Sequence, residues 1–290
     1  MTYGRAVFGD NQFLGVNHAN QAKAAEHFKR FSDPDQIIEV LGAAYQAGLR
    51  DFMFTTHERY EPVFEEIRRS NLFAGMHYTP CLPYAHKYWN RLSNDGLIAA
   101  IAMPLWQANP MKIIPAGLGM LVGKNRGLIS LVTQIEILMC KGLPVRGIFL
   151  QNAATDFLLA MQRLRELEGF AIAVERLGVE PGFITMNHPA AVKALTVEIG
   201  LTNPWICSNF NVGGFRMNPS PNVVRASFAT SGTRNMAMSV FSSLGASATV
   251  ALDNVLDAVC TGSVDAILFG SASPQNIAKN AKLIFEKPIL

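Results

Sequence analysis

Short apolar runs alternate with longer helical patterns along the whole chain, and eight such pairs can be laid out. Each run has the length of a buried strand, and each following stretch has the apolar spacing of an amphipathic helix. The predicted strands are Gln12–Val16, Asp51–Thr55, Gly75–Thr79, Arg146–Gln151, Gly182–Asn187, Trp205–Ser208, Met236–Phe241 and Ala266–Phe269. Eight strand–helix pairs in 290 residues predict an α/β fold, the closed parallel (β/α)8 TIM barrel.

Start and stop signals support the helices between these strands. The predicted helix Asp35–Ala47 is preceded by a Ser-Asp-Pro sequence and followed by Gly48, which are typical helix boundaries. Further helices are predicted over Pro62–Ser70, Ala154–Leu177 with a break near Gly169, Pro189–Ile199, Ala248–Val259 and from Ser273–Pro274 onward. An open doubly wound sheet is the alternative, but no GxGxxG sequence follows the first predicted strand.

Two connections are longer than a minimal barrel needs, Pro80–Leu143 and Asn209–Arg234. Long connections often carry function or a subunit contact. The first contains the apolar, glycine-containing run Ile113–Gly123, so we expect it either to cap the barrel mouth or to form a contact in a homo-oligomer. The prediction is one barrel domain over residues 1–290 with an enlarged segment between the third and fourth strands.

The charge pattern and the cysteines limit the cellular role. Twenty-five Lys and Arg against 22 Asp and Glu give a net charge of +3, spread along the chain, which does not favour binding to nucleic acid or to a membrane surface. The apolar stretch Gly96–Leu105 is too short to cross a bilayer, and the N-terminus lacks a secretory signal. The four cysteines are far apart in sequence, so we expect reduced thiols in a cytoplasmic protein.

Histidines follow several of the predicted strands, where TIM barrels hold their chemistry. His18, His57 and His188 come directly after the first, second and fifth strands. Three imidazoles with an open position suit catalytic zinc or iron, with Glu58 or Cys207 as a further ligand. The alternative is that these histidines act without a metal, as acid–base groups or as hydrogen-bond donors to loops or substrate.

Amide and hydroxyl groups also gather at the predicted strand ends. Those expected to orient a substrate are Asn17, Gln151, Asn152, Asn187, Ser208 and Asn209. The last strand runs through Gly270, Ser271 and Ser273 into a helix whose free N–H groups are suited to an anion. These three residues and Asn276 are therefore candidates for holding a phosphate, with simple helix capping as the alternative. Arg216, in the loop after the sixth strand, is a further candidate for binding a carboxylate or phosphate, unless that loop is an ordinary turn.

The final segment, VDAILFGSASPQNIAKN at 264–280, resembles the end of the aldo-keto reductases, where this stretch holds the adenosine phosphate of NADPH. AGLRDFMFT at 47–55 and CSNFN at 207–211 are similar to other sequences of that family. The resemblance implies the barrel fold. It also implies a catalytic set of an Asp after the second strand, a nearby Tyr, a Lys after the third strand and a His after the fourth.

The catalytic set of that family is not preserved here. Only Tyr60 matches, while Met53, Phe54 or Thr55 stands where the Asp is expected. The third strand ends in Thr-Pro-Cys instead of Lys, and the fourth ends in Gln-Asn instead of His. Ala272 and Asn276 occupy the neighbourhood in which a basic residue would meet the 2′-phosphate, and the nearest is Lys279, so NADPH is less expected as a cofactor.

We therefore predict an enzyme that acts on a small anionic metabolite, phosphorylated or not, by histidine-centred acid–base chemistry. The candidate catalytic residues are His57, His188, His18, Tyr60 and Glu58. A divalent metal on His18, His57 and His188 would make it a metal-assisted lyase, isomerase or hydrolase. The alternatives are an NAD(P)H-dependent oxidoreductase with a substituted catalytic set, and a barrel that binds a ligand without catalysis.

Overall fold

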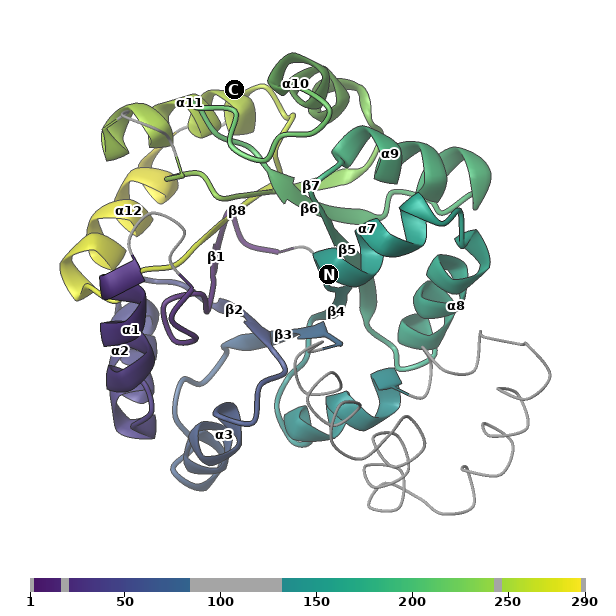
Figure 1. The fold of residues 1–290 in the computed structure, drawn as a ribbon. Helices are drawn as coiled ribbons and strands as arrows, with labels where there is room; N and C mark the ends of the chain where they lie inside the picture. The colour runs from purple at the N-terminus through teal and green to yellow at the C-terminus, as the bar shows by residue number, and fades with distance from the viewer. Residues whose placement is uncertain (1–2, 17–20, 84–131, 243–246, 288–290) are drawn as a thin grey trace, which may run out of the picture.

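The structure is a computed structural model that describes residues 3–16, 21–83, 132–242 and 247–287. Eight parallel strands close into a barrel in sequence order, because β8 pairs with β1 as well as with β7. Figure 1 looks along this barrel and shows the helices arranged around the ring of strands. The predicted (β/α)8 fold is confirmed, and the open doubly wound sheet is excluded.

The strands lie close to the predicted positions except for the first. They are β1 (Ala6–Phe8), β2 (Asp51–Thr55), β3 (His77–Leu82), β4 (Gly147–Leu150), β5 (Glu180–Thr185), β6 (Trp205–Asn209), β7 (Arg234–Met238) and β8 (Ala266–Phe269). The helices are α1 (Gln21–Arg30), α2 (Pro34–Gln46), α3 (Tyr60–Arg69), α7 (Asn152–Ala160), α8 (Leu164–Glu175), α9 (His188–Val192), α10 (Pro221–Thr230), α11 (Ala248–Cys260) and α12 (Pro274–Glu286). A short 3-10 helix, η2 (Ile137–Cys140), precedes β4, and a π-helix, η3 (Lys193–Glu198), continues α9.

The first strand was predicted at Gln12–Val16, and this prediction is wrong. That segment is a loop folded by three short-range hydrogen bonds, from the N–H of Phe13 to the carbonyl of Asp10, from Gly15 to Gln12 and from Val16 to Asn11. It is apolar because the Phe13 ring packs on Phe8, Phe31 and Phe52 outside the barrel, at centroid separations of 4.9 to 6.2 Å. The apolar residues of this segment therefore belong to a packed loop, and β1 lies earlier in the chain.

The helix predicted over Ala154–Leu177 is two helices, and the break lies before Leu164 instead of at Gly169. Gln162, with φ at +53°, turns the chain between α7 and α8. Ser273 caps α12 as predicted, because its side chain accepts a hydrogen bond from the N–H of Asn276. Of the predicted long connection Pro80–Leu143, residues 80–82 belong to β3, and residues 84–131 lie outside the described part of the chain.

Side chains alternate between the inside of the barrel and the helical layer. The interior holds Val7, Met53, Cys81, Phe149, Trp205, Cys207, Met236 and Ala266, with Tyr3 beneath them. Gly182 leaves room for the ring of Phe149, which a Cβ at position 182 would meet at 2.3 Å. Phe8, Phe52, Phe54 and Tyr78 face the other way and pack with the helices in the largest core cluster. The barrel is therefore filled, as TIM barrels are, and its strand ends remain for chemistry.

Two ion pairs lie at the amino-terminal ends of the strands. Arg146 pairs with Asp51, whose side chain is 3% exposed, and also contacts His77. Arg234 binds Glu180 at 2.7 Å, and Glu180 accepts a second hydrogen bond from the indole of Trp205 at 2.9 Å. Asp51 and Glu180 therefore each have an arginine beside them. In the described residues no helix is both long and apolar enough to cross a membrane.

Candidate active site

Asp10 lies two residues beyond β1, at the carboxyl-terminal end of the barrel. Its side chain is buried, with the residue only 7% exposed. Its Oδ2 atom accepts a hydrogen bond of 2.7 Å from the backbone N–H of Thr55 and one of 3.1 Å from the hydroxyl of Tyr60. The ends of β1 and β2 and the start of α3 are thus joined at one carboxylate.

Thr55 extends this cluster into the barrel. Its hydroxyl is hydrogen-bonded to Asp10 and also accepts a bond of 3.1 Å from Nε2 of Gln151, at the end of β4. Thr55 follows the inward-facing Met53 by two residues, so its side chain faces the barrel interior. The result is a hydrogen-bonded chain of four residues, Gln151–Thr55–Asp10–Tyr60, which we call the mouth cluster.

Burial sets the protonation behaviour of the mouth cluster. It raises the pKa of Asp10 to about 6, although the hydrogen bonds from Thr55 and Tyr60 lower it. Burial and the neighbouring Asp10 carboxyl raise the pKa of Tyr60 well above its ordinary value. Asp10 therefore exchanges a proton near neutral pH, whereas Tyr60 keeps its proton and positions the carboxyl group.

Partly buried apolar side chains also pack on the interior of the barrel. Ile184, Met238 and Leu268 are partly buried against the filled interior of the barrel, one each from β5, β7 and β8. The amide of Asn209, at the end of β6, is used to hold the following loop, because it donates to the carbonyl of Arg216 at 3.1 Å. The mouth thus combines an apolar surface with polar groups from β2 and β4, as small-molecule sites commonly do.

Of the three predicted histidines, the structure describes His57 and His188. His57 is half-buried, and its Nδ1 accepts a hydrogen bond of 3.0 Å from the N–H of Arg59 within the same turn, while Glu58 is exposed. Asn17 and His18 lie outside the described residues. No group of three metal-binding side chains is found where the structure is described, so the metal site on His18, His57 and His188 stays a prediction.

His188 is fully buried in the helical layer. Its Nδ1 lies 2.9 Å from the hydroxyl of Ser227, and its Nε2 lies 3.0 Å from Oδ1 of Asn235. The ring stacks on Phe228 of α10 at a centroid separation of 4.0 Å. Burial lowers the pKa of His188 to about 4, which keeps the imidazole neutral. Both ring nitrogens are engaged in packing α9 and α10 against β7, an arrangement that supports a structural role.

The remaining predicted site residues mostly hold local structure. Asn187 caps α9 by accepting from the N–H of Ala190 at 3.3 Å, Asn152 begins α7, and Ser208 donates to the carbonyl of Thr185 at 2.8 Å. Arg216 is exposed and lies over the ring of Phe215. Of all the predicted polar candidates, Gln151 and Tyr60 are the two that enter the mouth cluster.

The segment predicted to bind phosphate has the geometry of a capped helix start. Ser273 accepts from the N–H of Asn276 at 3.4 Å, and Ser271 accepts from the N–H of Ser273 at 3.2 Å. A Cβ at Gly270 would lie 2.2 Å from Oε1 of Gln12, so this glycine lets the loop after β1 approach β8. Gly270 and Asn276 are exposed.

Sequence reasoning missed Asp10 because the first strand was placed after it. The available signal was the run Ala6–Phe8 followed by Gly9 and Asp10, a short β-prone segment with a carboxylate directly behind it. The apolar sequence at 12–16 outweighed this shorter run. A three-residue strand carries little periodicity, so only the closed sheet identifies it.

No family model and no curated protein matches the chain. Solved structures do match its fold. Two structures of a Pseudomonas aeruginosa protein, described provisionally as an aldo-keto reductase, align at a TM-score of 0.55 and 10% identity, over 97% and 98% of this chain and 90% and 91% of theirs. A mutant of the protein Gox0644 in complex with NADPH aligns at a TM-score of 0.50 and 10% identity, over 99% of this chain and 84% of that one. The likeness confirms the fold that the resemblance to aldo-keto reductases implied.

These neighbours contradict our main functional prediction, the histidine-centred lyase, isomerase or hydrolase. Two of them are described as aldo-keto reductases and the third is in complex with NADPH, which fits the oxidoreductase class that we had placed second. The placement of His188 agrees with this correction, because its two ring nitrogens face Ser227 and Asn235 in the helical layer. His188 shows that a position next to a strand end in the sequence does not fix the direction of a side chain.

Proposed function

We propose that the chain is a nicotinamide-dependent oxidoreductase that reduces a carbonyl group, or oxidises the corresponding alcohol, with a catalytic set different from that of the aldo-keto reductases it resembles. The single observation that carries the proposal is the mouth cluster, in which a buried carboxyl group with a pKa of about 6 is linked to the barrel interior through a hydroxyl. The barrel's likeness to aldo-keto reductases supports the reaction class. The spread cysteines support a reducing, cytoplasmic setting.

The residues at the mouth fit a nicotinamide cofactor that lacks a 2′-phosphate. The start of α12 and the hydroxyls of Ser271 and Ser273 are suited to a phosphate group. No Lys or Arg occurs between Gly270 and Ile277, so a 2′-phosphate would find no basic partner in that segment. We therefore propose that NADH serves at least as well as NADPH.

When bound, the reduced nicotinamide supplies the hydride that the carbonyl carbon needs. The chain supplies the proton for the carbonyl oxygen. We assign this step to the hydroxyl of Thr55, which gives its proton to the substrate oxygen and takes one from Asp10. Asp10 is left as a carboxylate, and its pKa of about 6 lets solvent protonate it again at neutral pH.

Tyr60 and Gln151 position this proton path. Oδ2 of Asp10 accepts from the N–H of Thr55 and from Tyr60, and these two hydrogen bonds hold the carboxyl group beside the Thr55 hydroxyl. Gln151 donates to the Thr55 hydroxyl and so directs its oxygen. In the aldo-keto reductases the carboxylate follows the second strand; here the second strand ends in a threonine, and the carboxylate comes from β1.

The test measures oxidation of NADH and of NADPH at 340 nm with 4-nitrobenzaldehyde and a set of aliphatic aldehydes and ketones. Thr55→Val keeps the side-chain shape and removes the hydroxyl, so we expect turnover to fall about 100-fold, as it should with Asp10→Asn. The matched control is Thr196→Val, because the Thr196 hydroxyl donates only to a carbonyl in its own helix, at 2.8 Å. If neither cofactor is consumed and neither quenches tryptophan fluorescence, the proposal is wrong and a ligand-binding barrel remains.

A further inference from the structure

A cavity of about 410 Å³ lies at the amino-terminal ends of the strands, away from the mouth cluster. It is bounded by the end of α3, by the loop that leads into β3, and by residues 142–144 ahead of β4. Its walls include Ile67, Leu72, Phe73, Met76, Leu143 and Pro144. The volume falls in the range of small-molecule sites and is far larger than one water molecule needs.

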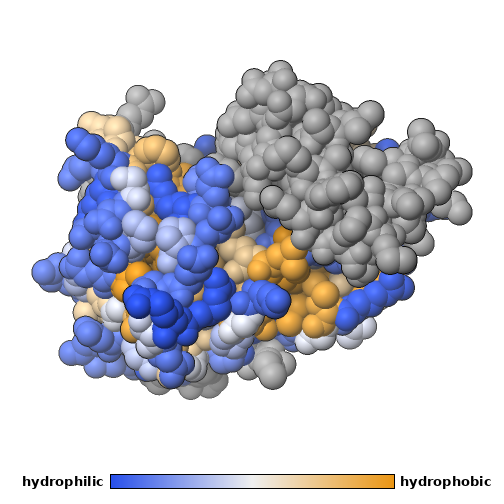
Figure 2. All heavy atoms as spheres, turned by 90° about the horizontal axis from the view of Figure 1, so that it is seen from below, coloured by the Kyte–Doolittle hydropathy of each residue, from blue (hydrophilic) through white to orange (hydrophobic). Residues whose placement is uncertain are grey.

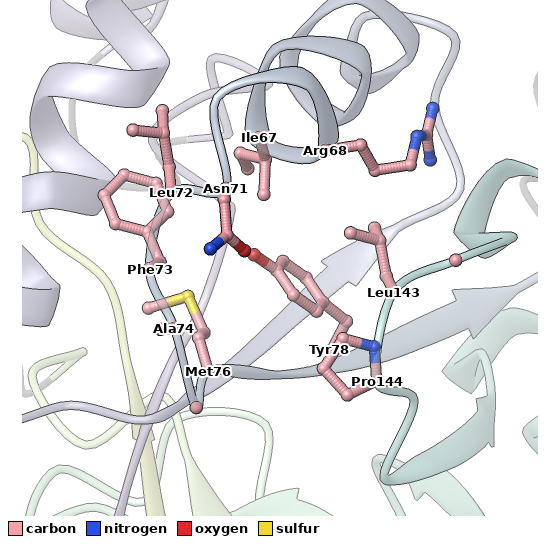
Figure 3. A pocket seen from close by; sticks show the side chains of 12 residues that line it. Ile67, Arg68, Asn71, Leu72, Phe73, Ala74, Met76, Tyr78, Leu143 and Pro144 are labelled. Carbon is pink, nitrogen blue, oxygen red and sulfur yellow. The ribbon is translucent and has the colours of Figure 1, made fainter.

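One polar group is buried in this cavity without a partner. The Tyr78 side chain is 1% exposed, and among the described residues its hydroxyl has no hydrogen-bond partner. Figure 3 shows its ring reaching into the space between α3 and Leu143, with the hydroxyl turned toward the amide of Asn71. A buried hydroxyl without a hydrogen bond is costly, so an acceptor that enters the cavity would remove that cost.

The lining also has a defined charge. Among the described residues it contains one cationic side chain, Arg68, and no Asp or Glu. Arg68 is fixed at the rim by donating to the carbonyls of Met139 and Lys141 at 3.3 and 3.2 Å. An anion is therefore favoured over a cation at the polar end, while the aliphatic and aromatic walls favour a hydrocarbon body.

The backbone around the cavity is held in an unusual conformation. Asn71 and Phe73 both have positive φ, at +49° and +57°, and Gly75 follows at +78°. A positive φ is strained for a phenylalanine, and such strain persists only where surrounding contacts hold it. This loop turns Asn71 toward the cavity and places the Phe73 ring in its wall. The conformation of the loop therefore determines the shape of the cavity.

We propose that this cavity binds a small monocarboxylate with an apolar tail, whose carboxylate accepts hydrogen bonds from the Tyr78 hydroxyl and the Asn71 amide. The site lies on the face opposite the mouth and is independent of the proposed reaction. Figure 2, which views the molecule from the side of α3, shows hydrophobic side chains reaching the surface among hydrophilic ones on this side. A ligand that enters here has apolar surface to cover.

The probe is sodium octanoate, titrated into the full chain and followed by isothermal calorimetry, with 1-octanol and octylamine as neutral and cationic analogues. We expect octanoate to bind with a stoichiometry near one and more tightly than either analogue. Tyr78→Phe removes only the hydroxyl and should weaken octanoate about tenfold, because hydrogen bonds to charged acceptors are the strong ones. Asn71→Asp keeps the shape and the tolerance of positive φ but adds a negative charge, and should weaken octanoate further.

The control is Thr230→Val, since the Thr230 hydroxyl donates to the carbonyl of Ala226 in its own helix, α10, at 2.9 Å, and neither residue lines the cavity. It should leave octanoate affinity unchanged. Two results would overturn the proposal. One is that the wild-type chain does not bind octanoate, which would mean that the cavity holds only water. The other is that octanoate binds equally to wild type, Tyr78→Phe and Asn71→Asp, which would place its site elsewhere.

Discussion

The two ends of the barrel treat buried carboxylates in opposite ways. At the amino-terminal end, Asp51 lies against Arg146 and Glu180 lies against Arg234. At the carboxyl-terminal end, Asp10 accepts hydrogen bonds from neutral groups, the amide and hydroxyl of Thr55 and the hydroxyl of Tyr60. The carboxylates beside arginines hold structure, whereas burial raises the pKa of Asp10, whose partners are neutral, to about 6. The amino-terminal end of the barrel thus contributes to stability, whereas the carboxyl-terminal end holds the carboxyl group that can transfer a proton.

Removing the arginine at the stabilising end should give the largest effect on stability. Arg146→Met leaves Asp51 buried without its cation, and we expect the free energy of unfolding to fall by about 3 kcal/mol in urea denaturation at pH 7. The control is Arg69→Met, in an exposed pair with Glu66, where the arginine side chain is 76% exposed; there we expect a change close to the error of the measurement. Equal effects of the two substitutions would show that the amino-terminal ion pairs do not stabilise the barrel.

Asp10 should act in the opposite direction on stability. Its pKa is raised from 3.8 to about 6, so the folded state binds a proton that the unfolded state has lost between these values. Stability from this group is complete below pH 3.8, decreases as the pH rises toward 6, and above that is lower by about 3 kcal/mol. Asp10→Asn should therefore stabilise the protein at pH 7 by about 1 to 3 kcal/mol while it lowers turnover about 100-fold. A variant that is less stable at pH 7 would contradict the raised pKa.

His188 should show the reverse pH dependence. Its pKa is lowered from 6.5 to about 4, so between these pH values the unfolded state binds a proton and the folded state does not. Stability therefore decreases as the pH falls from 6.5 to 4. Between pH 4 and 6 the contributions of His188 and Asp10 cancel, at about 1.4 kcal/mol per pH unit each. Urea denaturation at pH 4, 5 and 6 should therefore give a stability that rises with pH in Asp10→Asn and falls with pH in His188→Gln. If the free energy of unfolding changed with pH in the same direction in both variants, one of the two pKa shifts would be absent.

The sequence was informative about the fold because its signals are local and repeated. β2 and β8 lie where the apolar runs place them, and the Ser273 cap follows from a Ser-Pro start. The first strand could not be found in the same way. Phe13 packs a loop against the outside of the barrel, so the apolar sequence around it has the same pattern as a strand. The true strand, Ala6–Phe8, is too short to show the alternation of apolar and polar residues that predicts a strand.

The candidate site was harder to predict than the fold because it depends on direction as well as position. His188 and Gln151 both stand next to strand ends, yet the histidine turns outward to Asn235 and the glutamine turns inward to Thr55. The carboxyl group that completes the mouth cluster comes from β1, while the resemblance to aldo-keto reductases directs attention to the end of β2. The parallel pairing of β1 with β2 brings these two strand ends together.

The smallest expected effect comes from adding a cation at the start of α12, where the carboxyl-terminal end of the barrel has no basic side chain between Gly270 and Ile277. Asn276→Arg adds a guanidinium to the exposed first turn of that helix. If the adenosine end of the cofactor lies there, the ratio of NADH to NADPH dissociation constants, from fluorescence quenching, should shift about tenfold in favour of NADPH. The shift should shrink at high salt because the new contact is exposed. Asn276→Gln, which adds length without charge, should leave the ratio unchanged. An unchanged ratio in both variants would move the phosphate site away from α12, while the mouth cluster would keep its separate test in Thr55→Val.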